Sequence, residues 1–144
     1  MLRNAGVSFM ADLTFEEAEA FWRETATADD GRVIVAAEDE GGICGVVMVI
    51  PAWPPNQPHR ADISKLLVHS RARRRGVAEA LMAEAEAAAR EMGRTLLMLD
   101  TVEASAAERL YRRLGWTAYG VVPDFALLPD GRPWGCTFFY KALA

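Results

Sequence analysis

The residues most able to do chemistry lie in one run, residues 68–78, in which Arg73, Arg74 and Arg75 precede Gly76. An apolar, strand-like segment comes before this run, and a helix-like segment follows it. The first N–H groups of a helix have no partner within the helix, and the helix dipole is positive there, so they can bind phosphate oxygens. Gly76 would let a phosphate approach the backbone closely, and the arginines add positive charge. The run therefore predicts a site for a pyrophosphate group.

A run with four arginines among residues 71–75 can also be a solvated surface or a nucleic-acid patch. The formal net charge of −4 argues against a nucleic-acid partner, because such proteins carry a basic excess. The run also lacks the interleaved aromatic residues that stack on bases, so an RNA-binding domain is the weaker alternative. Neither a Walker A pattern nor GxGxxG occurs in the sequence, so the hypotheses of an ATP site and of an NAD site lose their main support.

Two motifs together carry a family resemblance. Residues 73–78 read Arg-Arg-Arg-Gly-Val-Ala after a segment that ends in Val68, and residues 107–116 read Ala-Glu-Arg-Leu-Tyr-Arg-Arg-Leu-Gly-Trp. With an apolar strand between these motifs, the chain resembles the GCN5-related N-acetyltransferases, whose acetyl-CoA pyrophosphate loop has the first pattern. The resemblance covers roughly residues 11–144. A finer similarity, to the branch that includes tabtoxin-resistance acetyltransferases, lies in residues 53–56, 65–69 and 99–101.

The resemblance implies an α/β fold in which a central mixed sheet, flanked by helices, holds a cleft between two parallel strands. It also implies an acyltransferase, in which the acetyl group of acetyl-CoA passes to a primary amine of a small molecule by direct attack. A backbone N–H of the strand that ends at Val68 would polarise the thioester carbonyl. The residues expected to bind acetyl-CoA, the co-substrate, are Leu66, Leu67, Val68, Arg73, Arg74, Arg75, Gly76, Val77, Ala78 and Tyr111.

Tyr111, in the second motif, is the catalytic acid that the resemblance implies. It would donate a proton to the departing thiolate, and the pKa of a tyrosine, near 10, is close to that of a thiol. Without the motif, Tyr111 would instead be interpreted as a core aromatic residue at helical spacing.

Asp62 and Asp100 are the candidate catalytic bases, because an amine arrives protonated and must lose a proton before it attacks. Asp100 ends an apolar strand, where an unpaired carboxylate is costly and its pKa rises, as suits a general base. Asp62 could equally be an exposed carboxylate at a strand end. The residues expected to bind the acceptor are Trp53, Asp62, Asp100 and Asp124.

Trp53 and Asp124 fall in two predicted loops. Three prolines within residues 54–58 follow Trp53, and such a segment can shape a pocket or serve only as a surface connector. Asp124 falls in a longer predicted loop, residues 123–135, from which it could hold a cationic acceptor.

Two features depart from the family pattern. Members usually carry Asn seven residues before the tyrosine, where this chain has Ala104. Family domains also begin with a strand and a helix ahead of the segment that matches residues 13–22, and only 12 residues precede it here. We therefore expect the first β–α unit to be absent, which would leave a sheet edge exposed. The alternative function is a non-catalytic CoA-binding module on a degenerate acetyltransferase fold.

Length and composition indicate one globular domain, residues 1–144. Cys44 and Cys136 have no CxxC pattern or histidine cluster beside them, so we expect no metal site and a reducing compartment. The apolar runs are far shorter than the ~18 residues that span a bilayer, and no secretory signal is visible. We therefore expect a cytoplasmic enzyme without a membrane partner. Dimers are common among relatives, which makes a homodimer an open expectation.

The elements that must position these residues follow from capping patterns and periodicity. Thr14 and Glu17 form a capping-box pattern at the start of a helix, and Ser105 and Glu108 form another. Between the third and fourth predicted strands, a helix completes a βαβ unit with a parallel strand pair. The predicted strands are residues 32–39, 43–50, 61–68, 95–101, 116–122 and 136–143, and the connecting helix is residues 77–92.

Overall fold

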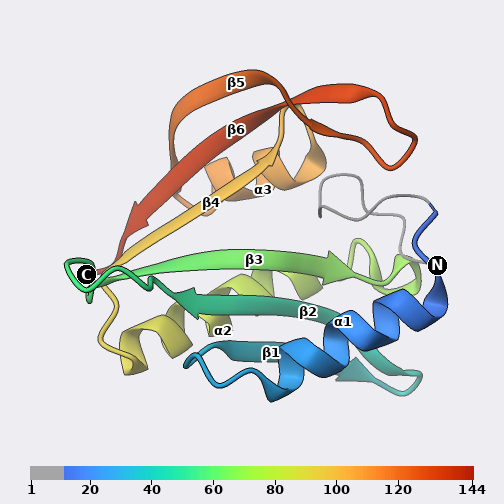
Figure 1. Ribbon diagram of the computed structural model, residues 1–144, viewed down its shortest axis with the longest axis horizontal. Coiled ribbons are helices and arrows are strands. Elements are labelled where there is room, and N and C mark those ends of the chain that lie inside the picture. Colours follow the sequence, from blue (N-terminus) through green and yellow to red (C-terminus); the bar gives the residue numbers. More distant parts are fainter. Residues whose placement is uncertain (1–11) are drawn as a thin grey trace.

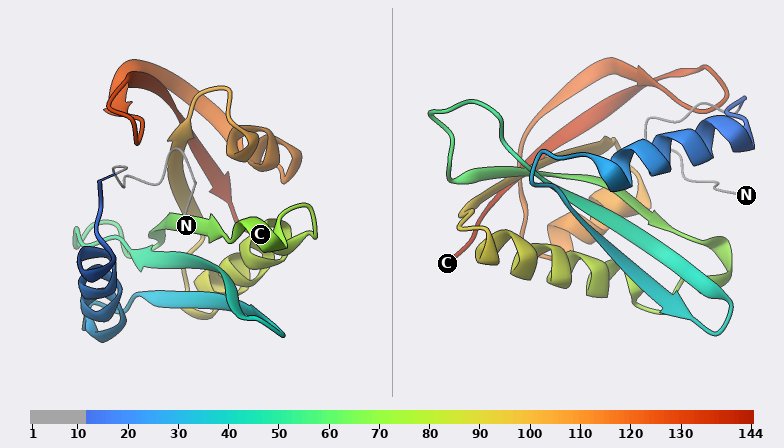
Figure 2. Two further views of the ribbon diagram at one scale, coloured as in Figure 1. Left: turned by 90° about the vertical axis from the view of Figure 1, so that its right-hand side faces the viewer. Right: turned by 60° about the horizontal axis from the view of Figure 1, so that its bottom comes forward.

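A computed structural model describes residues 12–144 of the chain as a six-stranded mixed sheet with helices on both faces (Figures 1 and 2). This architecture confirms the α/β fold that the sequence predicts. The described elements are α1 (Phe15–Thr27), β1 (Val33–Asp39), β2 (Gly42–Pro51), β3 (Arg60–Val68), the short 3₁₀ helix η1 (Ser70–Ala72), α2 (Val77–Glu91), β4 (Leu96–Val102), α3 (Ala106–Arg113), β5 (Thr117–Leu127) and β6 (Pro133–Ala142).

The sheet has the strand order β1-β2-β3-β4-β6-β5, and β3 and β4 are its parallel pair. These two strands pair only near their starts, where Arg60, Ala61 and Asp62 lie opposite Leu96, Leu97 and Met98. Beyond this point they diverge, as Figure 1 shows, so the sheet opens into a V between its two halves. The divergence is what positions the functional site.

Alternation along the strands decides what faces each side of the sheet. Ala61, Ile63, Leu97 and Leu99 are buried in the core, which α2 covers with Leu81, Met82, Ala85 and Ala89. The intervening residues of β3 and β4, among them Asp62 and Asp100, point to the opposite face, where α1 lies (Figure 1). The two faces therefore differ: one is the core covered by α2, and the other carries the carboxylates Asp62 and Asp100 among apolar side chains such as Phe138.

Of the two predicted capping boxes, the one at α1 is complete and the one at α3 is formed only in part. The Thr14 hydroxyl accepts from the Glu17 N–H at 3.1 Å while the Glu17 carboxylate accepts from the Thr14 N–H at 2.9 Å, which completes the capping box of α1. At α3, the Ser105 hydroxyl accepts from the Glu108 N–H as predicted, but the Glu108 carboxylate accepts from Ala104 N–H at 2.7 Å. Each helix thus begins where its sequence pattern predicts.

The prediction of a loop over residues 123–135 is wrong, because most of this segment belongs to two strands. β5 continues to Leu127 and β6 begins at Pro133, so only a short turn joins them. The strand passes through Pro123 and Asp124 because a bulge absorbs them: the register shifts between Val122 and Ala126, and Asp124 has φ 53. β5 is an edge strand, where a proline removes no hydrogen bond from a second neighbour. The expectation about a first β–α unit concerns the segment before α1, and residues 1–11 lie outside the described part of the chain.

Candidate functional site

A cleft of ≈ 710 Å³ occupies the V between the diverging ends of β3 and β4. Its walls come from the second half of β3, the loop that follows η1, the first turn of α2, the end of β4 and the inner face of α3. Segments from two motifs far apart in the sequence therefore meet in one cavity.

A bulge shapes the β3 wall of the cleft. The pairing of β2 with β3 shifts register between Val46 and Met48, and opposite this shift Lys65 adopts a left-handed conformation with φ 55. A bulge leaves one residue outside the ladder and re-aims its neighbours. Leu66 and Val68 line the cleft, whereas Leu67 is buried and does not. The bulge thus coincides with the part of β3 that lines the cavity, where the sequence predicts an oxyanion-binding N–H.

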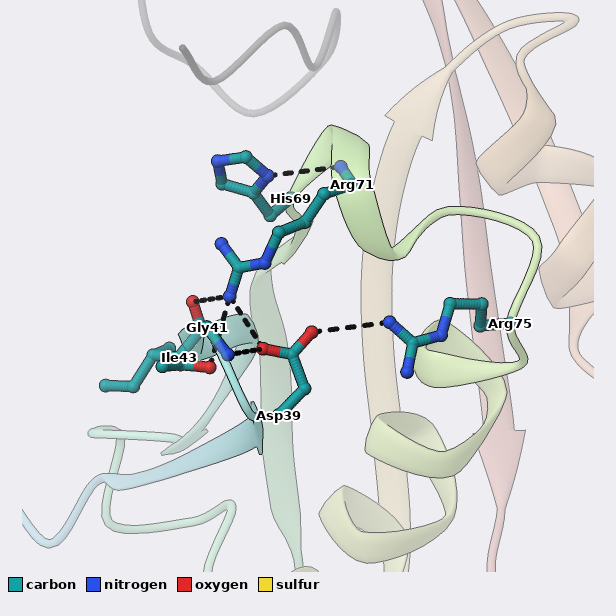
Figure 3. A network of polar contacts seen from close by, with 7 residues as sticks. Asp39, Gly41, Ile43, His69, Arg71 and Arg75 are labelled. Carbon is teal, nitrogen blue, oxygen red and sulfur yellow. Dashed lines mark hydrogen bonds and ion pairs between the residues drawn. The ribbon is translucent and has the colours of Figure 1, made fainter.

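The arginines of the loop divide into two pairs. Arg73 and Arg74 line the cleft. Arg71 and Arg75 instead bind the two carboxylate oxygens of Asp39, at 2.9 Å and 3.3 Å, as Figure 3 shows. The expected contact of Arg75 with the cofactor therefore competes with an ion pair outside the cleft.

Asp39 connects the loop to the turn between β1 and β2. Its Oδ1 also accepts from the Gly41 N–H at 2.8 Å, and Arg71 donates to the carbonyl oxygens of Gly42 and Ile43 at 3.2 and 3.4 Å (Figure 3). The hydrogen bond from Arg71 lowers the pKa of Asp39, which keeps this carboxylate charged in neutral solution. This network holds the arginine loop against the hairpin.

The N-terminus of α2 faces the cleft without a side-chain cap. Gly76, the N-cap residue, has φ 75, and an added Cβ there would meet open space. Only glycine adopts this backbone without strain. Val77 and Ala78 also line the cleft, so the unpaired N–H groups of the first helical turn lie at its wall.

The charge of the cleft is opposite to that of the whole chain. Its lining includes five basic residues, Lys65, Arg73, Arg74, Arg109 and Arg113, and two acidic ones, Glu79 and Asp100. The whole chain carries a formal charge of −4. A cavity lined mainly by one sign of charge attracts ligands of the other sign, here a polyanion.

Tyr111, on α3, lines the cleft. It is 5% exposed, and its ring packs against Trp116 and Phe139 with centroid distances of 6.0 and 5.9 Å. Burial, with a further contribution from the charge of Asp100, raises the pKa of Tyr111 far above its usual value. The pKa of Tyr111 is therefore not close to that of a thiol, contrary to what the sequence led us to expect, although the hydroxyl keeps its proton at neutral pH and can act as a donor.

Asp100 lines the cleft from the end of β4, on the face of the sheet opposite the core that α2 covers. Its neighbours Leu99 and Thr101 are buried, whereas Asp100 is itself solvent-accessible. Partial burial between the cleft walls raises the pKa of Asp100, the negative charge of Asp62 raises it further, and the positive charge of Lys65 opposes both. Asp62 does not line the cleft and accepts from Arg60 at 2.6 Å. Of the two candidate bases, Asp100 therefore has the better placement.

The comparisons with known proteins agree with this geometry. A family model described as "Acetyltransferase (GNAT) family" matches residues 5–116. The chain belongs to the GNAT acetyltransferase family. It is therefore an acyltransferase, and acetyl-CoA is its co-substrate.

Solved structures of other GNAT proteins are similar over most of this acetyltransferase. A ribosomal-protein-alanine N-acetyltransferase from Brucella melitensis is 27% identical, with a TM-score of 0.79 over 95% of this chain and 84% of that one. A GCN5-related N-acetyltransferase from Kribbella flavida is 26% identical, with a TM-score of 0.78 over 96% and 82%. A phosphinothricin acetyltransferase from Sinorhizobium meliloti, in complex with acetyl-CoA, is 22% identical and has a TM-score of 0.75 over 89% and 70%.

Besides Asp62, two further residues predicted to bind the acceptor, Trp53 and Asp124, lie outside the cleft of the acetyltransferase. Trp53 is 89% exposed in the segment between β2 and β3 and does not line the cavity. Asp124 occupies the bulge of β5, also exposed and away from the lining. Their predicted roles find no geometric support here.

Sequence reasoning missed several residues of the acetyltransferase site. Arg109 and Arg113 line the cleft from α3, and their spacing of four around Tyr111 in the second motif is a signal that could have identified them. Asp39 and Arg71 gave no such signal, because their pairing joins segments 32 residues apart. In residues 12–144, no group of three or more potential ligands could hold a metal ion. Nor does that stretch contain a helix long and apolar enough to cross a membrane.

Proposed function

We propose that this acetyltransferase transfers the acetyl group of acetyl-CoA directly to a primary amine of a small molecule. The observation that carries the proposal is the single cleft in which the arginine loop, the bulged end of β3, Tyr111 and Asp100 meet. A polyanionic donor, an oxyanion, a departing thiolate and an incoming ammonium group each have a complementary partner there.

The donor half of the cleft suits the pyrophosphate and pantetheine of acetyl-CoA. Arg73 and Arg74 supply positive charge, and the N–H groups of the first turn of α2 supply donors that no side chain caps. Leu66 and Val68 offer the bulged backbone of β3 to the extended pantetheine, and an N–H there would stabilise the oxyanion.

The reaction needs two proton transfers around one acyl transfer. The amine nitrogen forms a bond to the acetyl carbon as the carbon–sulfur bond breaks. Asp100, directly or through water, takes the proton that the ammonium group loses, and its raised pKa suits this role. Tyr111 donates a proton to the thiolate and regains one from solvent after the product leaves. Asp62 remains a second candidate base, although it lies outside the cleft and pairs with Arg60.

The acceptor class is tested with a panel of primary amines, following free thiol release from acetyl-CoA. The panel includes amino acids, polyamines, simple alkylamines and a peptide with an N-terminal alanine, since one relative is a ribosomal-protein-alanine N-acetyltransferase. Acetylation of free amines supports the proposal. Acetylation of the peptide alone would contradict the small-molecule acceptor, and no acetylation at all would contradict an amine acceptor of this range.

Location and assembly are part of the same proposal. We expect the enzyme in the cytoplasm, which the two free and buried cysteines, Cys44 and Cys136, support. We expect a homodimer, and the exposed apolar side chains of Val121 and Val122 on the edge strand β5 support self-association. Analytical ultracentrifugation measures the second expectation, which a monomer at micromolar concentration would contradict.

A further inference from the structure

A second, smaller cavity adjoins the cleft on the face of the sheet to which Asp100 points. It has a volume of ≈ 60 Å³, and its lining includes Asp100, Phe125, Leu127, Leu128, Trp134 and Cys136. We refer to this cavity as the notch. It lies between the end of β4 and the far ends of β5 and β6.

Asp100 is the one residue that lines both the cleft and the notch in the described part of the chain. On one side of it lies the cavity that contains Tyr111 and the arginine loop, and on the other lies the notch. A ligand whose ammonium group binds the Asp100 carboxylate would therefore extend toward the donor at one end and into the notch at the other.

The walls of the notch are apolar except for this carboxylate. Phe138 lies opposite Asp100 in the β4–β6 pairing. The ring of Phe125 packs edge-on against the ring of Phe138, with centroids 5.1 Å apart. The indole N–H of Trp134 donates to the Glu103 carbonyl at 2.9 Å, so it has no need of a ligand acceptor. A buried cysteine such as Cys136 behaves as a small hydrophobic residue.

Size and polarity together define what the notch can take. A water molecule needs roughly 10–15 Å³ of cavity volume, so the notch of ≈ 60 Å³ has room for about four or five heavy atoms. A hydroxylated or charged chain would find no hydrogen-bond partner on these apolar walls. A short branched alkyl chain would fill the space and lose no hydrogen bond.

We propose that the notch is the specificity subsite of the acceptor: it binds the compact apolar substituent of a primary amine whose ammonium group lies at Asp100. This inference rests on the function proposed above and adds the chemical class of the substrate. Aliphatic amines with a branched carbon chain are preferred over amines that lack a chain and over polyamines.

The test compares isoamylamine with methylamine, two amines of similar basicity, by kcat/KM for thiol release. We expect isoamylamine to be preferred at least about tenfold, because each methylene in an apolar pocket contributes about 10–200-fold in specificity. The variant Ala126→Phe places a ring at an exposed notch residue and should remove this preference by slowing isoamylamine alone. Val121→Phe, on the same strand but outside both cavities, is the matched control and should keep it.

The possible outcomes distinguish failure of the subsite proposal from failure of the proposed function. Equal kcat/KM for the two amines in the unsubstituted protein would overturn the notch proposal while leaving amine acetylation intact, and this result does not depend on the folding of any variant. A preference that survives in a folded Ala126→Phe protein would also overturn it. Turnover of no amine, in protein that still gains thermal stability from CoA, would overturn the proposed function and the subsite with it.

Discussion

The donor half and the acceptor half of this molecule are built in different ways. The donor half consists of the loop before α2, the bulge of β3 and the first turn of a helix, and its key groups belong mostly to the backbone. The acceptor half consists of Asp100 and the side chains of β5 and β6 that form the notch. A backbone site depends on a few glycines and small residues at fixed spacing, whereas a side-chain site depends on residues brought together from three strands.

This difference explains why one half is general and the other selective. Every member of a family that uses acetyl-CoA must bind the same pyrophosphate, and helix N–H groups with positive charge serve any such ligand. In the proposed site the acceptor contacts exposed side chains of the β5–β6 ribbon, which can change without disturbing the core. Substitutions in the donor half should therefore weaken CoA binding, whereas substitutions in the acceptor half should slow acetyl transfer and leave CoA binding unchanged.

The largest effect is expected from Tyr111→Phe, at the junction of the two halves. The ring packing against Trp116 and Phe139 is preserved, but the proton donor is lost, which typically costs about 10²–10⁴ in rate. Steady-state thiol release measures kcat, and a thermal shift with CoA should be unchanged. Tyr119→Phe, outside the cleft, is the control. A kcat close to that of the unsubstituted enzyme would show that water or another group protonates the thiolate.

Gly76→Asp should break the donor half alone. It places a carboxylate at the phosphate site and forces a side chain into a left-handed backbone at φ 75. CoA at a hundredfold excess over its Kd stabilises a folded protein by about 2.7 kcal/mol, and this gain should disappear from the thermal melt. Gly93→Asp carries the same backbone strain, at φ 73, at the far end of α2 and controls for it. If both variants retained the CoA shift, the pyrophosphate would bind elsewhere.

Asp100→Asn should impair the acceptor half, by about 10² in kcat/KM, and leave CoA binding unchanged. The pKa of Asp100 is raised, so the base becomes active as pH rises through a value above 3.8, and this acidic limb should vanish in the variant. The stability of the fold should change with pH in the opposite direction to the activity. Ionised Asp100 opposes folding, so the unsubstituted protein loses stability as pH rises through that window, and the Asn variant does not.

The matched control for this variant is Asp124→Asn, which removes an exposed carboxylate outside both cavities. An acidic limb that persists in Asp100→Asn would transfer the role of base to Asp62, and Asp62→Asn should then remove it. If the limb persisted in both variants and in the double variant, the enzyme would capture the neutral amine without a carboxylate base.

The smallest effect is expected from Asp39→Asn, which weakens the network that holds the arginine loop. Arg71 and Arg75 lose a charged partner, so the loop gains freedom and CoA binds a few-fold more weakly by calorimetry. Because the pKa of Asp39 is lowered, the network persists above the ordinary carboxylate pKa and is lost only as pH falls through the lower folded value. Asp30→Asn, which removes a similar pair with Arg32 far from the loop, should leave CoA affinity unchanged.

Local patterns in the sequence predict most of the fold and the donor half. The caps at Thr14 and Ser105, the βαβ unit and the pyrophosphate loop each depend on residues a few positions apart, so a single segment carries the signal. The exact course of β5 was not predictable in the same way, because a bulge at Asp124 lets a proline-containing segment continue as a strand.

The remaining features depend on contacts between distant segments. Asp39 binds arginines more than thirty positions later, and Asp100 becomes the link between two cavities only when β5 and β6 fold beside β4. Trp53 illustrates the converse: an aromatic residue beside prolines resembles a pocket wall in the sequence, yet its side chain is almost fully exposed. Pairing across the sheet, which no local pattern encodes, decides these cases.

The most direct test of the account is the affinity of a bisubstrate conjugate in which CoA is joined to isoamylamine through an acetyl bridge. If the cleft and the notch meet at Asp100, the conjugate occupies both cavities at once, and titration calorimetry should find it binding about 10²–10⁴ more tightly than CoA. Ala126→Phe should remove most of this gain, because it blocks the notch without touching the donor half. A conjugate that binds no more tightly than CoA would contradict the claim that the two halves form one continuous site.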